Sequence, residues 1–176
     1  MKLHHSPPVH LMYIPEAEAI NQALLDGFDR ELNGEHTHQS HFELGRFENT
    51  YIERTAIPEM EKLIDIALEA ARKILGKNAL KVGFWFNAMQ PGQRTLRHNH
   101  DEDDELLSCV YYVSAPEESG DLIVHHADGS LRVKPEVGKF VFFSPRLAHE
   151  VEENHSNQRR LSIAFNFGET NAGIND

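Results

Sequence analysis

Two histidines one residue apart, His98 and His100, stand in the stretch RHNHDEDDE, directly before an acidic run. In a strand or its extended end, residues i and i+2 point the same way, so these imidazoles can face one metal ion. A third ligand must come from elsewhere, and His149 is the candidate because it opens a new predicted strand after the turn SPRLA. We therefore predict a metal site that contains His98, His100 and His149.

Arg160 lies eleven residues after His149, in the segment RRLSIAFNF, which has the alternation of a strand. One predicted face is polar or small and consists of Arg160, Ser162, Ala164 and Asn166. The other face is apolar and consists of Leu161, Ile163, Phe165 and Phe167. An arginine inside an otherwise apolar strand needs an anionic partner. A ligand carboxylate, held by two parallel hydrogen bonds, would supply it.

Two helices are predicted in the first half of the chain. The first is indicated by Ile20, Leu24 and Phe28 after Pro15. The second has a stronger apolar pattern, between Pro58 and Gly76, made of Met60, Ile64, Ala67, Ala71 and Ile74. Each helix is apolar on one side only and needs a partner surface.

The segment between these helices, residues 34–51, reads GEHTHQSHFELGRFENTY. It is polar, and we predict an irregular loop. Its histidines His36, His38 and His41 lack acidic or cysteine residues in step with them, so we predict solvated side chains rather than metal ligands.

After residue 78 the pattern becomes that of strands rich in β-branched and aromatic residues. The segments are LKVGFWFNAM, LLSCVYYVSA, GDLIVHHADGSLRVKP, GKFVFFSP and RRLSIAFNFG, with a hairpin predicted at Asp128-Gly129 and a turn at 135–138. Six to eight short strands without alternating helices predict a sandwich or barrel. The helices would cover its outer face, giving a single domain with helical support at about 14–77 and a β core at about 79–168.

The net charge of −11 argues against a nucleic-acid backbone or an anionic membrane as a partner, because both require clustered positive charge. The single Cys109 excludes an internal disulfide, and the N-terminus MKLHHSPPVH lacks the apolar segment of a secretion signal. No apolar run approaches the roughly 20 residues that span a bilayer. We therefore predict a cytoplasmic protein.

Four motifs in the same order resemble the 2-oxoglutarate/iron(II)-dependent oxygenases. They are GFWFNAMQPGQRTLRHNH, LLSCVYYV, PEVGKFVFFSPRLAHEV and RLSIAFNF, and the resemblance covers about residues 45–168. The chain is most similar to a small bacterial and phage group of oxygenases with a His-x-His motif, and LSCVYYV and FFSPRLAHEV are also similar to prolyl hydroxylases. The resemblance implies a double-stranded β-helix, that is, a jelly roll with supporting helices.

The resemblance also implies roles for individual residues. His98 and His149 match the two metal histidines, and Arg160 matches the basic residue that pairs with the distal carboxylate of 2-oxoglutarate. Three further positions would contact the co-substrate or substrate, namely Tyr112 through its hydroxyl, Ser162 on the face of Arg160, and Asn87.

The position two after His98 departs from the usual His-x-Asp/Glu motif, because it is His100. Three interpretations follow: His100 is the third ligand, the carboxylate comes from the acidic run 101–105, or the pair is His100 with Glu102. The spacing from Gly92 and the group's own His-x-His favour the first. The acidic run is otherwise a solvated loop, or a lid that selects a basic substrate.

The activity implied by the resemblance is that of an Fe(II)- and 2-oxoglutarate-dependent dioxygenase, with hydroxylation as the default outcome and 2-oxoglutarate decarboxylated to succinate. The substrate would be a small molecule or a peptide. Two alternatives remain open. A three-histidine site is similar to that of cupin-type dioxygenases that do not use 2-oxoglutarate, and a jelly roll can also be a binding module without catalysis.

Overall fold

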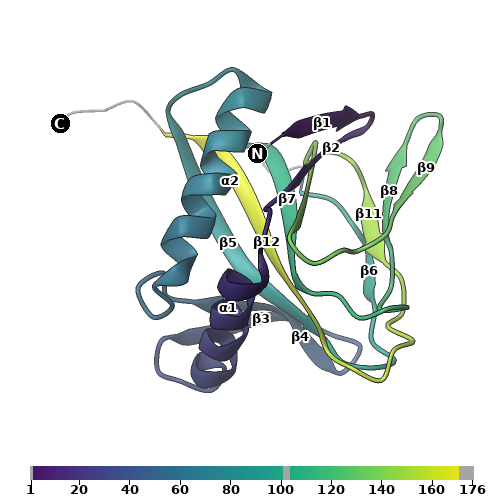
Figure 1. Cartoon of the computed structure of the whole chain (residues 1–176). Coiled ribbons are helices and arrows are strands. Elements are labelled where there is room, and N and C mark those ends of the chain that lie inside the picture. Colours follow the sequence, from purple (N-terminus) through teal and green to yellow (C-terminus); the bar gives the residue numbers. More distant parts are fainter. Residues whose placement is uncertain (1, 101–103, 171–176) are drawn as a thin grey trace.

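The computed structural model describes residues 2–100 and 104–170. Two antiparallel β-sheets face each other, and two helices cover the outer face of the larger sheet (Figure 1). This is the mainly β jelly roll with supporting helices that the sequence predicted. The chain's second half supplies eight of the strands, which agrees with the expected six to eight.

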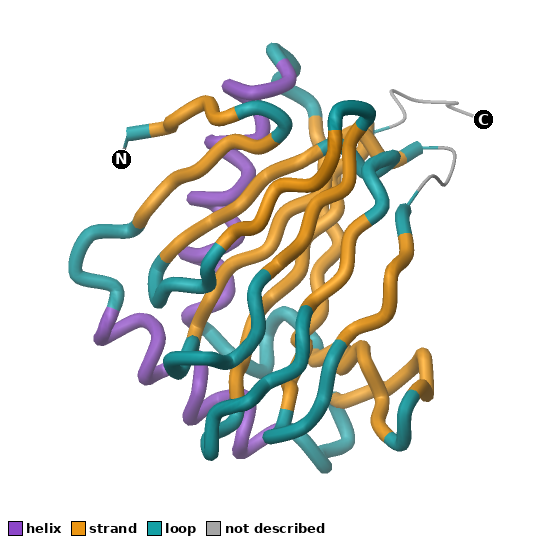
Figure 2. Tube along the Cα trace, turned by 90° about the vertical axis from the view of Figure 1, so that its right-hand side faces the viewer, coloured by secondary structure: helices purple, strands orange, loops and turns teal. Residues whose placement is uncertain are grey.

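The strands of each sheet lie side by side in an order that differs from the order along the chain (Figure 2). The large sheet runs β1 (Leu3–Ser6), β2 (Val9–Tyr13), β10 (Lys139–Phe143), β7 (Glu105–Ser114), β12 (Arg160–Glu169), β5 (Leu80–Met89), β4 (Arg46–Ile52) and β3 (Thr37–Glu43). The small sheet runs β6 (Thr95–His98), β11 (His149–Val151), β8 (Leu122–His126) and β9 (Gly129–Val133).

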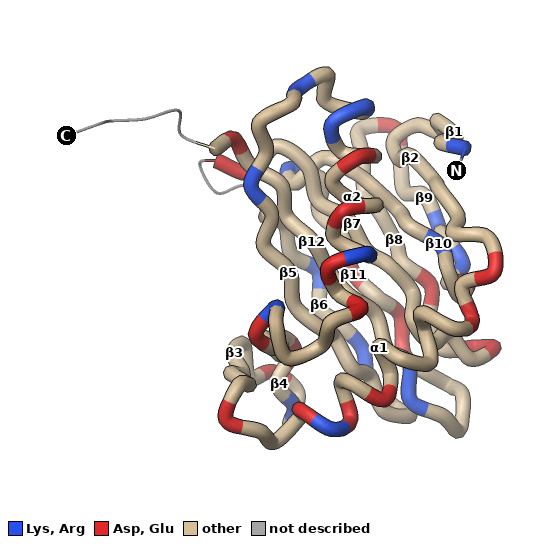
Figure 3. Tube along the Cα trace, turned by 60° about the vertical axis from the view of Figure 1, so that its left-hand side comes forward, with Lys and Arg blue, Asp and Glu red and all other residues tan. Residues whose placement is uncertain are grey.

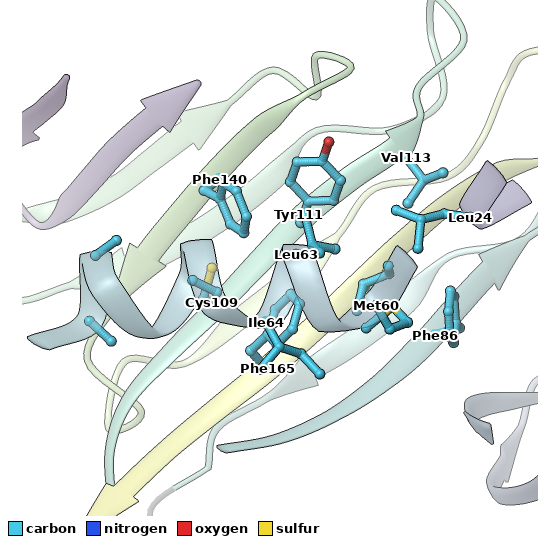
Figure 4. Packing of buried hydrophobic residues seen from close by; sticks show 14 of the residues in the cluster. Leu24, Met60, Leu63, Ile64, Phe86, Cys109, Tyr111, Val113, Phe140 and Phe165 are labelled. Atoms are coloured by element: carbon cyan, nitrogen blue, oxygen red, sulfur yellow. The ribbon is translucent and has the colours of Figure 1, made fainter. Parts of the chain in front are cut away.

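Both helices form where the apolar periodicity predicted them, as α1 (Glu18–Glu31) and α2 (Glu59–Leu75). Helix α2 ends at Gly76, which has φ 65°, a left-handed conformation that glycine adopts without strain. Leu63 and Ile64 of α2 pack against the large sheet around Tyr111 and Phe165 (Figure 4). Burying each aliphatic side chain contributes about 1.5–3 kcal/mol, so this face anchors the helix.

The large sheet separates two apolar cores. On its helix side, the apolar residues of β12 are completely buried; these are Leu161, Ile163, Phe165 and Phe167. On its other side, Tyr112 and Val141 pack against Val124 of the small sheet. The predicted alternation of β12 is confirmed, and its polar face looks into the space between the sheets.

The prediction of an irregular loop at 34–51 was wrong, because this segment forms the hairpin of β3 and β4 at one edge of the large sheet. Strand β4 does alternate in burial, but three of its four buried residues, Arg46, Glu48 and Thr50, are polar, and only Ile52 is apolar. Glu48 borders the space between the sheets, and Thr50 is paired with Phe86 of β5. With polar residues at three buried positions, the strand lacks the apolar repeat by which strands are recognised. The N-terminal strands β1 and β2 were also not expected.

The predicted hairpin turn is shifted by one residue. His126 pairs with Gly129, so the two-residue loop is Ala127-Asp128, and Gly129 is the first residue of β9, with φ 135°. The turn at 135–138 is present, and it brings Gly138 so close to α1 that a side chain there would meet Ala17.

Acidic and basic positions are interspersed along the face shown in Figure 3, including α2 and the β3–β4 hairpin. Within residues 2–100 and 104–170, neither helix has the length and apolar character needed to cross a membrane.

Candidate active site

The three histidines that the sequence singled out meet at the end of the small sheet. His98 closes β6 and His149 opens β11, and the two are paired residues of that ladder. His100 follows β6, and its backbone N–H donates to the carbonyl of Pro145 at 2.9 Å. One ring nitrogen from each histidine lies within 4.8 Å of the others, so three imidazoles surround one point.

Backbone carbonyls orient two of these rings in the same way. Nδ1 of His98 is 2.8 Å from the carbonyl oxygen of Leu96, and Nδ1 of His149 is 3.0 Å from that of Leu147. A carbonyl only accepts hydrogen bonds, so each Nδ1 carries the proton. Nε2 of each ring is then unprotonated and can bind a metal, which is the usual arrangement of metal-binding histidines.

Burial keeps the deeper imidazoles neutral. Burial, together with the neighbouring His98, lowers the pKa of His100 to about 4 and the pKa of His149 to about 3. Since a metal binds the neutral form of histidine, His100 and His149 can bind a divalent cation at neutral pH without losing a proton. The donor set therefore fits Fe(II), for which imidazole is a suitable ligand.

The carboxylates proposed as alternative ligands are only partly described. Residues 101–103, including Glu102, lie outside the described part of the chain. Asp104 forms an ion pair with Lys81, and Glu105 begins β7. Among the described residues, the one cluster of three or more possible metal ligands consists of His98, His100 and His149.

Arg160 lies in the same cavity as the histidines and is 1% exposed. Its Nη1 donates to the carbonyls of Ser119 and Gly120, but its Nε has no hydrogen-bond partner among the described residues. The hydroxyl of Tyr112 is likewise buried and without such a partner, and the guanidinium carbon lies 5.0 Å from the Tyr112 ring centre. Two buried donors without acceptors fit an anionic ligand group such as a carboxylate.

Both groups keep the protons needed for such contacts. Burial raises the pKa of Tyr112 to about 12, although the adjacent Arg160 opposes the shift, so the phenol is protonated at neutral pH. Burial lowers the pKa of Arg160, and Tyr112 partly offsets this. Tyr112 lies behind Arg160 and is not part of the cavity wall.

Ser162 and Asn87 also lie where the sequence predicted them. They are directly opposed on β12 and β5, and both line the cavity. The Ser162 hydroxyl is 3.5 Å from the Asn87 carbonyl, a weak contact that leaves it able to bind a ligand. All seven predicted site residues thus lie in or directly behind one cavity of about 380 Å³.

Several residues of the cavity wall were not predicted. Trp85 lies 5.8 Å from His100 between ring centres. Glu48 is held at 2.9 Å by Arg46, which also donates to Thr95. The position of Trp85 two residues before Asn87, on the same face of β5, was a usable signal for it. His41, expected to be solvated, is exposed but borders the cavity.

Comparison with known families agrees with this site. Residues 84–168 match the model of the family described as the 2OG-Fe(II) oxygenase superfamily. The matched segment, which contains the three histidines and Arg160, therefore resembles an oxygenase domain of that superfamily, whose members use Fe(II) as the metal and 2-oxoglutarate as the co-substrate. A search of curated proteins finds no significant match.

Solved structures share the fold. A prolyl-4-hydroxylase from Pseudomonas putida has 20% identity and a TM-score of 0.66, with 93% of this chain and 88% of that chain covered. The non-heme alpha ketoglutarate dependent carbocyclase SnoK from nogalamycin biosynthesis has 15% identity and a TM-score of 0.76, with 96% and 84% covered. A Trichoplax adhaerens prolyl hydroxylase, in complex with a hypoxia inducible factor peptide, has 13% identity and a TM-score of 0.71, with 93% and 84% covered.

Proposed function

We propose that the protein is a 2-oxoglutarate-dependent hydroxylase in which His98, His100 and His149 bind Fe(II). The observation that supports this assignment is the presence, in one cavity, of three converging imidazoles and a buried arginine whose Nε–H has no partner in the described part of the chain. The first group suits a divalent metal and the second suits the far carboxylate of a dicarboxylic acid. A three-histidine site of the cupin type that binds a neutral ligand would not need the buried arginine.

Each residue has a defined task in this proposal. Arg160 neutralises the distal carboxylate of 2-oxoglutarate, and the Tyr112 hydroxyl donates to the same group, which together fix the co-substrate's orientation. Ser162 and Asn87, opposed on the cavity floor, contact the co-substrate or the substrate. When bound, Fe(II) and 2-oxoglutarate supply the oxidative decarboxylation that yields succinate and places one oxygen atom on the substrate.

The surroundings of the histidines support this chemistry by limiting water. His149 is buried and packs against the ring of Phe143 at 4.8 Å between centres, so the metal would have a dry side and an open side. The open side faces the cavity, which is where the substrate would approach. The substrate would be a small molecule or a peptide.

The proposal also includes the domain organisation and the cellular location of the enzyme. The helical support and the jelly-roll core would act as one oxygenase domain, because α1 and α2 pack on the sheet that carries Arg160. A cytoplasmic location would suit its buried, unpaired Cys109, since free thiols persist in a reducing compartment.

Anaerobic titration tests the proposal. Adding 2-oxoglutarate to the Fe(II)-loaded protein should produce the weak visible charge-transfer band of the metal-bound keto acid, and admitting oxygen should produce succinate. Absence of both would refute a 2-oxoglutarate-dependent enzyme. Iron binding without the band would instead favour a three-histidine dioxygenase of the cupin type.

A further inference from the structure

A second hollow, of about 410 Å³, lies beside the active-site cavity. The two spaces share two wall residues, Trp85 of β5 and Asn166 of β12. Trp85 stands between them, because its ring centre is 5.8 Å from that of His100 on one side and 6.1 Å from that of Tyr51 on the other. One side chain therefore separates the second hollow from the histidine cluster.

The walls of this hollow are flat and largely apolar. The rings of Tyr51 and Trp85 face it from β4 and β5, at a separation typical of interacting aromatic rings. Gly83 contributes only backbone, and a Cβ built on it would have no atom of residues 2–100 and 104–170 within 4 Å. This glycine has an ordinary φ, so no turn requires it; its missing side chain is what leaves the space open.

The three charged side chains that line the hollow, Lys81, Asp104 and Glu105, already have partners within the protein. Lys81 and Asp104, on its rim, form an ion pair with each other. Asn166 accepts a hydrogen bond of 2.9 Å from Ser108 through its side-chain oxygen. An occupant with a net charge would have to displace one of these existing contacts to gain a partner, whereas an uncharged ring would leave them intact.

We propose that this hollow is a second substrate subsite, which binds an uncharged aromatic group against the rings of Tyr51 and Trp85 while the reacting end of an elongated substrate lies at the histidine cluster. The location of the reacting end rests on the proposed function; the subsite itself does not. Trp85, shared by both spaces, would then set the distance between the ring and the reacting carbon.

The single tryptophan of the chain makes the subsite directly observable. N-phenyl-1-naphthylamine is an uncharged aromatic fluorophore that accepts energy from tryptophan. Titrated into the metal-free full-length protein, it should give saturable energy transfer from Trp85. Gly83→Leu places a side chain in the hollow, at a position where a Cβ meets no described atom within 4 Å. It should weaken the probe's affinity by about tenfold or more, because the leucine occupies space that the probe needs.

Two matched variants control for the added side chain. Gly83→Ala, which is smaller, should have an intermediate effect, and Ser130→Leu, on the exposed strand β9, should have none. If Gly83→Leu does not fold, as judged by circular dichroism, Gly83→Val is held to the same criterion. Absence of saturable transfer in the wild-type protein, or equal affinity in wild type and the filled variant, would overturn the proposal.

The outcome is distinguishable from that of the proposed function. The charge-transfer band and the uncoupled formation of succinate report on iron and 2-oxoglutarate, and both should be unchanged in Gly83→Leu. Probe binding without the band would leave the subsite standing and refute the oxygenase assignment. The charge-transfer band without probe binding would support the oxygenase assignment and refute the subsite.

Discussion

His98 and His149 are opposed residues of the β6–β11 ladder, and their ring centres lie 4.3 Å apart. Their separation is therefore set by the backbone pairing of two strands and not by the conformation of a loop. Sites built on regular elements hold their geometry more precisely than sites on loops. His100 lies beyond the end of β6 and depends on the bond from its N–H to Pro145, which makes it the ligand whose role most needs a test.

We expect His100→Ala and His149→Ala each to weaken Co(II) binding by more than about a hundredfold, because ligands matter more than the outer groups whose loss costs 10–100-fold. The measurement is anaerobic titration followed by visible absorption. His126→Ala, at the end of β8 and outside the cavity wall, is the matched control. If His100→Ala binds as well as wild type, the third ligand belongs to the acidic run 101–105 instead.

Arg160→Ala should raise the KM for 2-oxoglutarate by about two orders of magnitude, since removing a buried charged partner costs about 2–5 kcal/mol. Affinity for Co(II) should stay within a few-fold of wild type, and Arg160→Lys should recover part of the loss. Arg132→Ala removes an exposed arginine paired with Glu152 and should change neither quantity. An unchanged KM in Arg160→Ala would mean that the co-substrate binds elsewhere.

Tyr112→Phe should separate stability from ligand binding. The Tyr112 hydroxyl is buried without a partner among the described residues, so its loss should leave the Tm of the ligand-free protein unchanged or higher. Added 2-oxoglutarate with a divalent metal should then raise the Tm less than in wild type, because the phenol no longer donates to the carboxylate. A variant that is simply destabilised, with a full ligand-induced shift, would contradict this role.

Tyr111→Phe should behave in the opposite way. The hydroxyl of Tyr111 donates to Asn21 of α1 at 2.7 Å, and both are buried. Its removal leaves an unsatisfied acceptor and should reduce the free energy of unfolding by about 1–3 kcal/mol, measured by urea denaturation. Combining it with Asn21→Leu should recover much of the loss. Equal stability of Tyr111→Phe and wild type would show that this bond contributes nothing.

The parts of the fold that follow from sequence are those with a clean apolar period. Helix α2 and strand β12 each bury one regular face, so local pattern alone placed Ile64 and Phe165 in the core and Arg160 opposite. The same alternation brought Ser162 and Asn87 to the cavity. The meeting of His98 with His149, by contrast, was expected from their strand positions together with a family resemblance.

The β3–β4 hairpin could not be recognised in this way, because most buried residues of β4 are polar and Arg46 needs a partner far away in the sequence. Arg46 bonds to Glu48 on its own strand and to Thr95 on β6. Such a network stabilises a polar strand only after the distant strand is in place, and no local window contains both partners. Trp85 lay within a predicted strand, yet its place between two hollows depends on Tyr51 of that unrecognised hairpin.

Strand β12 has one face in the helix-side core and the other in the catalytic cavity. Natural selection can therefore act on the two faces separately. Mutations at the core-facing residues are selected mainly for stability, and mutations at the cavity-facing residues are selected mainly for substrate specificity. A saturation scan along this strand would show the two kinds of sensitivity alternating, residue by residue. Substrate specificity can therefore change through mutations of the cavity-facing residues while the chain stays folded.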